Sequence, residues 1–354
     1  MKILTAIYNN RLVLAINSSK NKKYLCPICK SVVILKRGTE KISHFAHSKN
    51  NDCPNIGEHE TDEHLTGKIN LFKFINNKST KIECYITKIN QKPDLINNKI
   101  AFEFQCSPIT QKRLLERING YKSLGIHSLW ILGKNYRKKF SSKNTTKFFY
   151  YSFNIGFYIL FLHNSGYVEI RYNCLEINGI INYQSKIIYS FKELLSFIKS
   201  RQALLQYNNN LRQINYLLRN FRKNMILGNK AILNLQNDFY LKGHNIDGAP
   251  LLCNEKYFSY PIFDNKFFLW KIICLNNIED GINLDYLFKT LFKFTFPLIE
   301  NINIFYKHEF KTFINILVNE NLIKIESNVI HLLKDPIWFK DYLDRENIQN
   351  KKDL

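Results

Sequence analysis

Residues 93–106 read PDLINNKIAFEFQC, in which two short apolar segments flank the polar pair at positions 98–99. In the second segment, large apolar side chains alternate with Glu103 and Gln105, as expected for a strand whose successive side chains point to opposite faces. An antiparallel hairpin that turns at positions 98–99 would place Asp94 directly opposite Glu103, with Cβ atoms about 5 Å apart. The sequence therefore predicts two carboxylates that face each other on one side of a sheet.

Two carboxylates at that distance repel each other strongly unless a cation lies between them. Oxygen ligands suit Mg²⁺ or Mn²⁺, so Asp94 and Glu103 are candidate ligands of a catalytic divalent metal. Gln105, on the same face, can orient a water molecule or contact a phosphate, but it lacks the positive charge of a lysine. The alternative is an ordinary amphipathic hairpin whose acidic residues face solvent.

The segment upstream of the hairpin adds further polar candidates. Its apolar periodicity predicts a helix from about Glu58 to Ile75. Glu60, His64 and Lys68 recur every four residues and therefore lie on one face of this helix. Glu60 and His64 could reach the same metal or water, and Lys68 could contact a phosphate. A solvated, charged helix face is the alternative interpretation.

The segments after the hairpin indicate a partly parallel sheet. A strand at 100–106 is followed by a helix that Ser107 and Pro108 open and Gly125 closes, and then by a buried strand at 128–132. Strand, helix and strand in this order form a βαβ unit, and the fold class is therefore α/β. The other expected elements are an N-terminal hairpin of strands at 3–8 and 12–16, strands at 81–89 and 93–96, a linker or surface loop at 134–147, and hairpin strands at 150–162 and 167–172.

A second group of residues has the spacing of a zinc site. Cys26, Cys29, His44 and His47 form the pattern C-x2-C-x14-H-x2-H, and two such close pairs can supply the four ligands of tetrahedral zinc. Cys53 is a possible substitute, because five candidates compete for four places. A full set of four protein ligands leaves no open position, so the predicted site is structural. Two buried thiols and two surface histidines are the alternative.

The composition limits the possible partners. The chain of 354 residues contains 51 Lys and Arg against 29 Asp and Glu, a formal net charge of +22. This excess indicates nucleic acid or an anionic membrane surface as a partner, although the Lys, Asn and Ile bias of the whole chain accounts for part of it. No apolar stretch approaches the roughly 18 residues of a membrane span, and the first residues do not complete a signal peptide. Eight cysteines in a chain of this length favour reduced thiols and a cytoplasmic protein.

The C-terminal third is mainly helical in pattern. A helix at 306–321 presents Phe310, Phe313 and Leu317 on one face, and strands at 322–325 and 329–333 follow as a hairpin. A helix followed by a hairpin at the end of a helical segment suggests a winged-helix-like module. The alternative is a helical subdomain that packs on the core.

Several short motifs, taken in order, resemble the competence protein CoiA family of Gram-positive bacteria over about residues 1–135. They are Cys26-Pro27-x-Cys29, His44-Phe45-Ala46-His47, Glu60-x3-His64-Leu65-x-Gly67-Lys68, Pro93-Asp94, Glu103-Phe104-Gln105-Cys106-Ser107, Arg117-x3-Tyr121 and Trp130-Ile131-Leu132.

This resemblance implies a restriction-endonuclease-like fold of the PD-(D/E)xK type. It also implies a role in recombination of incoming single-stranded DNA during natural transformation. Asp94 and Glu103 would then be the metal carboxylates, and Glu60 the acid from the first helix. Gln105 stands where most such nucleases have Lys. The resemblance also places Arg117 and Tyr121 near the substrate. With His64 and Lys68, which the helix spacing indicates, they are the candidate substrate-binding residues.

The leading hypothesis is a metal-dependent DNA nuclease, or nuclease-like factor, of the competence pathway. The alternative is a non-catalytic recombination factor that binds single-stranded or branched DNA on a degenerate nuclease fold. A third hypothesis is a restriction-type endonuclease that recognises a defined duplex sequence. A recombinase such as RecA is a natural partner for the family's role. The expected domains are an N-terminal β hairpin and zinc-finger-like module at 1–56, a nuclease-like α/β domain at 57–200 and a mainly helical domain at 201–354.

Overall fold

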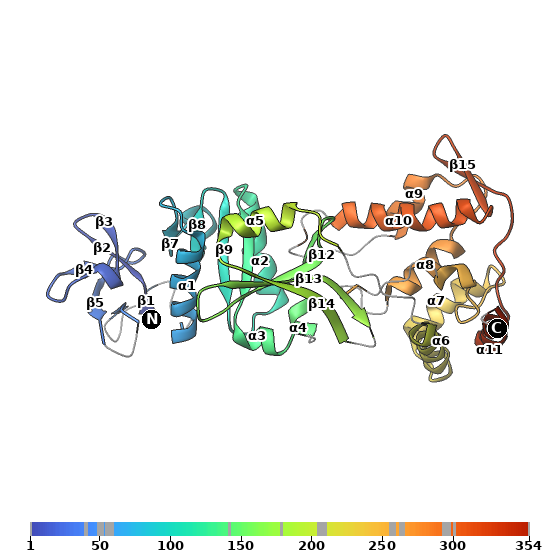
Figure 1. Cartoon of the computed structure of the whole chain (residues 1–354), viewed down its shortest axis with the longest axis horizontal. Helices are drawn as coiled ribbons and strands as arrows, with labels where there is room; N and C mark the ends of the chain where they lie inside the picture. Colours follow the sequence, from blue (N-terminus) through green and yellow to red (C-terminus); the bar gives the residue numbers. More distant parts are fainter. Residues whose placement is uncertain are drawn as a thin grey trace. The chain divides into compact units, whose positions relative to one another are not determined.

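The protein is mixed α/β and divides into two compact units (Figure 1). Unit 1 comprises Met1–Tyr172 and Gln184–Gln202, and unit 2 comprises Asn173–Tyr183 and Ala203–Leu354. A computed structural model describes residues 2–38, 42–47, 53, 60–140, 143–177, 180–203, 211–254, 260–261, 266–291, 299 and 302–352.

The N-terminal part of unit 1 is an antiparallel sheet of six strands in the order β1-β6-β5-β4-β2-β3. The β2–β3 hairpin turns at Asn9 and Asn10, whose φ angles of 48° and 57° are those of a two-residue turn between twisted strands. The predicted N-terminal hairpin is therefore confirmed. The elements are β1 (Lys2–Ile3), β2 (Thr5–Tyr8), β3 (Arg11–Leu14), the 3₁₀ helix η1 (Ala15–Asn17), β4 (Tyr24–Leu25), β5 (Val32–Lys36) and β6 (His44–His47).

A larger sheet follows, with eight strands in the order β14-β13-β12-β10-β9-β8-β7 and with β11 paired to β12. β9 and β10 run parallel with α2 between them in sequence, which confirms the predicted βαβ unit. The strands are β7 (Lys81–Ile82), β8 (Leu95–Asn97), β9 (Ile100–Gln105), β10 (His127–Leu132), β11 (Tyr150–Ser152), β12 (Gly156–Leu162), β13 (Val168–Ile177) and β14 (Ile180–Ile188).

The β8–β9 hairpin has the predicted register. Leu95 pairs with Phe102 and Asn97 pairs with Ile100, and Asn98 adopts a positive φ of 51° in the turn. Continued by one pair, this register places residue 94 opposite residue 103. Alternation of side chains and a two-residue turn were sufficient to predict this local geometry.

Helices α1 (Asp62–Ile75), α2 (Gln111–Ser123) and α5 (Phe191–Lys199) belong to the same unit (Figure 1). The hydroxyl of Thr61 accepts a hydrogen bond from the His64 N–H and so caps α1. This cap corrects the predicted helix start, because Glu60 lies before the helix rather than on its face.

Two other expectations for unit 1 were wrong. The strand predicted at 81–89 ends at Ile82, because Glu83 adopts a left-handed φ of 52° and the 3₁₀ helix η2 (Thr87–Ile89) follows. The loop predicted at 134–147 contains α3 (Lys134–Lys138) and α4 (Lys143–Thr146). Its polar composition concealed Tyr136 and Phe140, which are four residues apart and both buried.

Unit 2 is mainly helical and contains the predicted helix and hairpin, which are confirmed. None of the described helices combines the length and apolarity that a membrane span requires. The elements are α6 (Leu211–Ile226), α7 (Lys230–Tyr240), η3 (Leu251–Asn254), α8 (Lys266–Asn276), α9 (Leu284–Leu291), α10 (Ile302–Asn319), β15 (Ile323–Glu326), β16 (Val329–Leu332) and α11 (Tyr342–Lys352).

Close packing of α1 against β9 gives a test of this part of the fold. A Cβ atom at Gly67 would lie 2.1 Å from a ring carbon of the buried Phe104. Gly67→Ala should therefore force the two elements apart and lower the free energy of unfolding by about 1–3 kcal/mol, measured by urea denaturation. Gly38→Ala is the control, because a Cβ there meets no atom within 4 Å. Equal stability of the two variants would contradict this packing.

Candidate functional site

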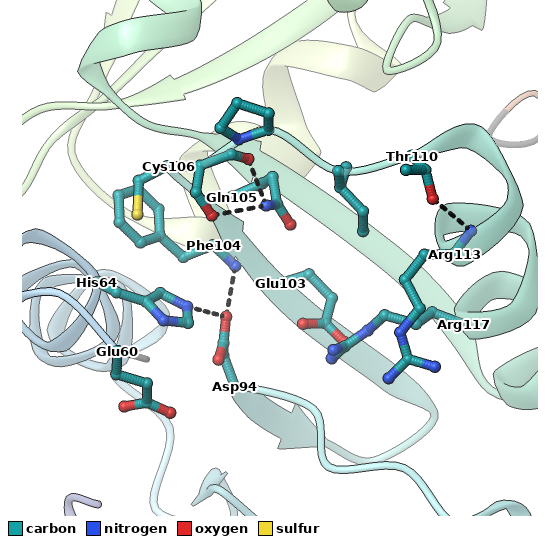
Figure 2. Close-up of a pocket in the computed structure, with 13 residues that line it drawn as sticks. Glu60, His64, Asp94, Glu103, Phe104, Gln105, Cys106, Thr110, Arg113 and Arg117 are labelled. Carbon is teal, nitrogen blue, oxygen red and sulfur yellow. Dashed lines mark hydrogen bonds and ion pairs between the residues drawn. The ribbon is translucent and has the colours of Figure 1, made fainter. Parts of the chain in front are cut away.

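A cavity of about 380 Å³ opens beside the β8–β9 hairpin, between α1 and the start of α2 (Figure 2). Figure 2 shows Glu60 and His64 on one side of the two strand acids and Arg113 and Arg117 on the other. Six of the eight residues predicted for the active site line this cavity, whereas Lys68 and Tyr121 lie behind it. The six are Glu60, His64, Asp94, Glu103, Gln105 and Arg117.

Asp94 is held on both carboxylate oxygens. The Phe104 N–H donates to Oδ2 (2.8 Å), His64 Nε2 lies 3.1 Å from the same oxygen, and Lys68 Nζ lies 3.4 Å from Oδ1. Burial alone would raise the pKa of Asp94, but the nearby charges of His64 and Lys68 outweigh it and hold the pKa well below its usual range. Asp94 is therefore an ionised carboxylate.

Lys68 is fully buried and lies among three carboxylates. Its Nζ is 2.7 Å from Glu60 Oε1 and 2.8 Å from Glu83 Oε1, in addition to its contact with Asp94. Burial would lower the pKa of Lys68, but Glu83 and Asp94 raise it above its ordinary value, so the ammonium stays charged. The predicted direct contact of Lys68 with a phosphate does not fit this burial, because the ammonium faces the protein interior.

Glu83 is a member of this network that the sequence analysis missed. Its Oε1 contacts Lys68, and its Oε2 accepts hydrogen bonds from the Leu4 N–H (2.9 Å) and the Thr5 hydroxyl (3.3 Å). Burial would raise its pKa, but the charges of Lys68 and Lys92 lower it to about 2. The sequence contains one weak signal for this role. Glu83 is an acid between two less polar residues, in a segment that was expected to be a strand.

Glu103 contacts Arg117 and Tyr121, two of the four residues that were predicted to bind the substrate. Arg117 Nη2 lies 2.5 Å from Glu103 Oε1, and the Tyr121 hydroxyl donates to the same oxygen. Burial raises the pKa of Glu103, and the charge of Arg117 offsets only part of this effect, while Asp94 adds to it. The pair of strand acids therefore favours additional positive charge.

The remaining polar atoms at the cavity show where a ligand could bind. The amide of Gln105 donates to the Ser107 carbonyl (2.6 Å), which fixes its side chain at the rim. Oε2 of Glu60 is buried and has no hydrogen-bond partner among the described residues. Glu60, Asp94 and Glu103 together supply the hard oxygen donors that Mg²⁺ and Mn²⁺ prefer.

The N-terminal sheet brings together four soft ligands. The ligand atoms of Cys26, Cys29, His47 and Cys53 all lie within 4.8 Å of one another, a group that could hold a metal such as zinc. Cys29 Sγ is 3.4 Å from His47 Nε2, and His47 Nδ1 is buried without a hydrogen-bond partner in the described part of the chain. Lys30 closes the turn between the cysteines with a left-handed φ of 60°. This donor set fits a closed tetrahedral zinc site.

Cys26 and Cys29, the two cysteines of the turn, differ in the pKa of their thiols. Burial would raise the pKa of Cys29, but hydrogen bonds from Ser31 and His47 lower it to about 6. Burial raises the pKa of Cys26 to about 11. A bound zinc ion would stabilise the thiolate form of both, since the metal binds deprotonated ligands.

His44 does not belong to this group, which corrects the predicted ligand set. His44 and His47 lie on one strand, β6, and residues three apart on a strand point to opposite faces. The Nδ1 atom of His44 lies 2.9 Å from the Ile42 carbonyl instead. Cys53, considered in the sequence as a substitute, takes the fourth place. A helical turn, rather than a strand, would be needed for the H-x2-H pair to share a metal.

Ligand replacement tests this assignment. We expect about one zinc ion per chain by elemental analysis, as a tetrahedral four-ligand site holds. His47→Ala or Cys53→Ser should remove most of the zinc, whereas the control His44→Ala should retain it. Loss of zinc from His44→Ala and retention by Cys53→Ser would restore the ligand set expected from the sequence.

Loss of the buried ammonium tests the charge network. Lys68→Met leaves three carboxylates without their shared cation, which should lower the free energy of unfolding by about 3–5 kcal/mol. Lys73→Met, at an exposed position of the same helix, should change it by no more than about 0.5 kcal/mol. Urea denaturation of both variants gives the comparison, and equal effects would show that the network does not stabilise the domain.

Comparisons with known proteins match the two parts of the chain that contain these groups. The model of the competence protein CoiA N-terminal domain matches residues 9–55, and that of the CoiA nuclease-like domain matches residues 60–229. Competence protein CoiA of Bacillus subtilis (strain 168) is 31% identical over 183 residues, which are 48% of this chain and 47% of the relative, so the match spans about half of that protein. No solved structure matches the chain. Through its N-terminal and nuclease-like domains, the chain belongs to the competence protein CoiA family.

Proposed function

We propose that the nuclease-like domain is a divalent-metal-dependent deoxyribonuclease of the PD-(D/E)xK type that acts on DNA during natural transformation. One observation carries the proposal: Asp94, directly before β8, and Glu103, on β9, lie at a cavity that Glu60 also lines. Membership of a competence family supports the biological setting. Single-stranded or branched DNA as the substrate, RecA as a partner and a cytoplasmic location remain predictions.

The proposed chemistry is phosphodiester hydrolysis. Asp94, Glu103 and Glu60 would hold a Mg²⁺ or Mn²⁺ ion, which when bound lowers the pKa of a water molecule and stabilises the pentavalent phosphate. Arg113 and Arg117 line the same cavity and can bind phosphate oxygens of the substrate. Gln105, fixed on Ser107, can orient a water molecule with its carbonyl oxygen.

Lys68 offers an explanation for the absence of a lysine at position 105. Its ammonium lies 3.4 Å from Asp94 Oδ1 and 2.7 Å from Glu60 Oε1, so a positive charge reaches the candidate metal ligands from α1 instead of from β9. Because Lys68 is buried behind these acids, it would act as a positioning residue. It would keep Asp94 and Glu60 ionised and oriented and would not touch the phosphate.

A second candidate function follows from the same network. Asp94 and Glu103 already have cationic partners in His64, Lys68 and Arg117. This favours, as the alternative, a recombination factor that binds single-stranded or branched DNA and does not cleave it. A restriction-type endonuclease that recognises a defined duplex sequence is a weaker third candidate.

A cleavage assay tests the proposal. Purified protein would be incubated with labelled single-stranded, duplex and branched DNA, with Mg²⁺ or Mn²⁺ and with EDTA. Asp94→Asn and Glu103→Gln should each reduce cleavage by roughly 100-fold or more, because each removes a ligand of the ion that stabilises the transition state. Glu320→Gln removes an exposed acid of unit 2, outside the nuclease-like domain, and it should keep full activity.

Further outcomes separate the candidates. Gln105→Lys should preserve or raise the cleavage rate, because it adds a charge where the phosphate develops negative charge. Cleavage that survives Asp94→Asn would place the active site elsewhere. A wild-type protein that binds these substrates but cleaves none of them with either metal would favour the binding factor.

A further inference from the structure

Helices α8, α9 and α10 and the β15–β16 hairpin of unit 2 form a small module around an aromatic core. Helices α8, α9 and α10 contribute one or two rings each: Trp270 lies 6.1 Å from Phe313, and Phe288 lies 5.4 Å from Phe310, between ring centroids. Trp270, Phe310 and Phe313 are buried. The aromatic side chains of α10 therefore pack against α8 and α9.

A short extended segment, 281–283, pairs with the two-stranded hairpin of this module. The Gly281 N–H donates to the Ile330 carbonyl, and the Ile330 N–H donates back to the Ile282 carbonyl, each at 2.9 Å. Asn283 forms a bridge with Val329. The segment at 281–283 lies between α8 and α9, so the chain order is helix, extended segment, helix, helix, hairpin. This is the order of a winged helix, whose third helix is the element that enters DNA in helix-turn-helix proteins.

The solvent face of α10 suits that role. Asn303, Lys307, Lys311 and Asn315 are exposed and recur every four residues, so they follow one another along the helix. None of the exposed residues of α10 is acidic. Neither lysine forms an ion pair within the described ranges. The face thus presents two available ammonium groups between two amides.

Glu309, the single acid of α10, is largely buried and does not belong to this exposed face. Glu309 Oε1 accepts a hydrogen bond from the Tyr260 hydroxyl (3.1 Å) and lies 3.3 Å from His308 Nδ1, and its side chain is only 11% exposed. Residues 266–332 contain equal numbers of lysines and acids, so the positive face does not follow from the average composition. It follows from where the charges are placed.

We propose that α10 is a recognition helix that binds duplex DNA, at a site separate from the nuclease-like cavity. A helix fits the major groove of B-form DNA, where asparagine can bind the N6 and N7 atoms of adenine. Lys307 and Lys311 bind phosphate oxygens, and Asn303 and Asn315 are the residues that can reach base edges. The ligand is a duplex because a single strand offers no groove for a helix.

Binding to labelled DNA tests the proposal on the full chain. Fluorescence anisotropy would be measured in EDTA with an Asp94→Asn background, for a duplex and for one of its single strands. Neither catalytic metal binding nor cleavage then contributes to the measured affinity. The test therefore stays valid even if the nuclease proposal fails. The variant Lys307→Ala/Lys311→Ala is compared with Lys230→Ala/Lys340→Ala, which removes the same charge from exposed positions of the same unit.

We expect Lys307→Ala/Lys311→Ala to weaken duplex binding roughly tenfold or more at 0.1 M salt. It should also reduce the slope of log affinity against log salt by about two, one for each lost phosphate contact. Single-strand binding should change less than about twofold, because the proposal assigns only duplex binding to α10. The control pair should match the parent protein.

A second measurement guards against indirect effects. A photo-crosslinking amino acid at position 315 should crosslink to the duplex, whereas the same group at position 230 should not. Unchanged circular dichroism would show that the lysine variants fold. Equal duplex affinities and salt slopes for the two double variants, or equal crosslinking from the two positions, would overturn the proposal. An equal loss of single-strand and duplex binding would also overturn it.

Discussion

The buried ammonium of Lys68 is the interaction on which the nuclease-like domain depends. Its three carboxylate partners come from separate parts of the chain: Glu60 precedes α1, Glu83 follows β7, and Asp94 precedes β8. A buried charge is tolerated only when its partners are in place, and removing one member leaves the others uncompensated. Helix α1, the turn after β7 and the β8–β9 hairpin must therefore assemble together.

The same network extends to the N-terminal sheet. Glu83 accepts hydrogen bonds from Leu4 and Thr5, at the bend between β1 and β2. Strand β1 pairs with β6, which carries His47 of the candidate zinc centre. A continuous series of strand pairs and hydrogen bonds thus joins the thiol cluster to the acids of the cavity. Both centres lie in one compact unit for this reason.

Local rules account for what the sequence could predict. The register of the β8–β9 hairpin follows from side-chain alternation and a two-residue turn, and the parallel pairing of β9 with β10 follows from the order of elements. The burial of Lys68 and the role of Glu83 depend on contacts between distant segments, which no pattern in the sequence encodes. The His44 error had a different origin. Spacing identified the ligand types, but the strand conformation of β6 decided which histidine could reach the metal.

Acidic and basic residues are concentrated in different parts of this protein. The cavity gathers Glu60, Asp94 and Glu103, and of its two arginines Arg117 is already engaged by Glu103. Such a site suits a metal ion, but it offers few cationic groups for the many phosphates of DNA. Most of the positive charge of the chain, +22 in total, lies outside the cavity. A helix whose solvent face carries lysines and no exposed acids, as in α10, is the kind of surface that suits a polyanion.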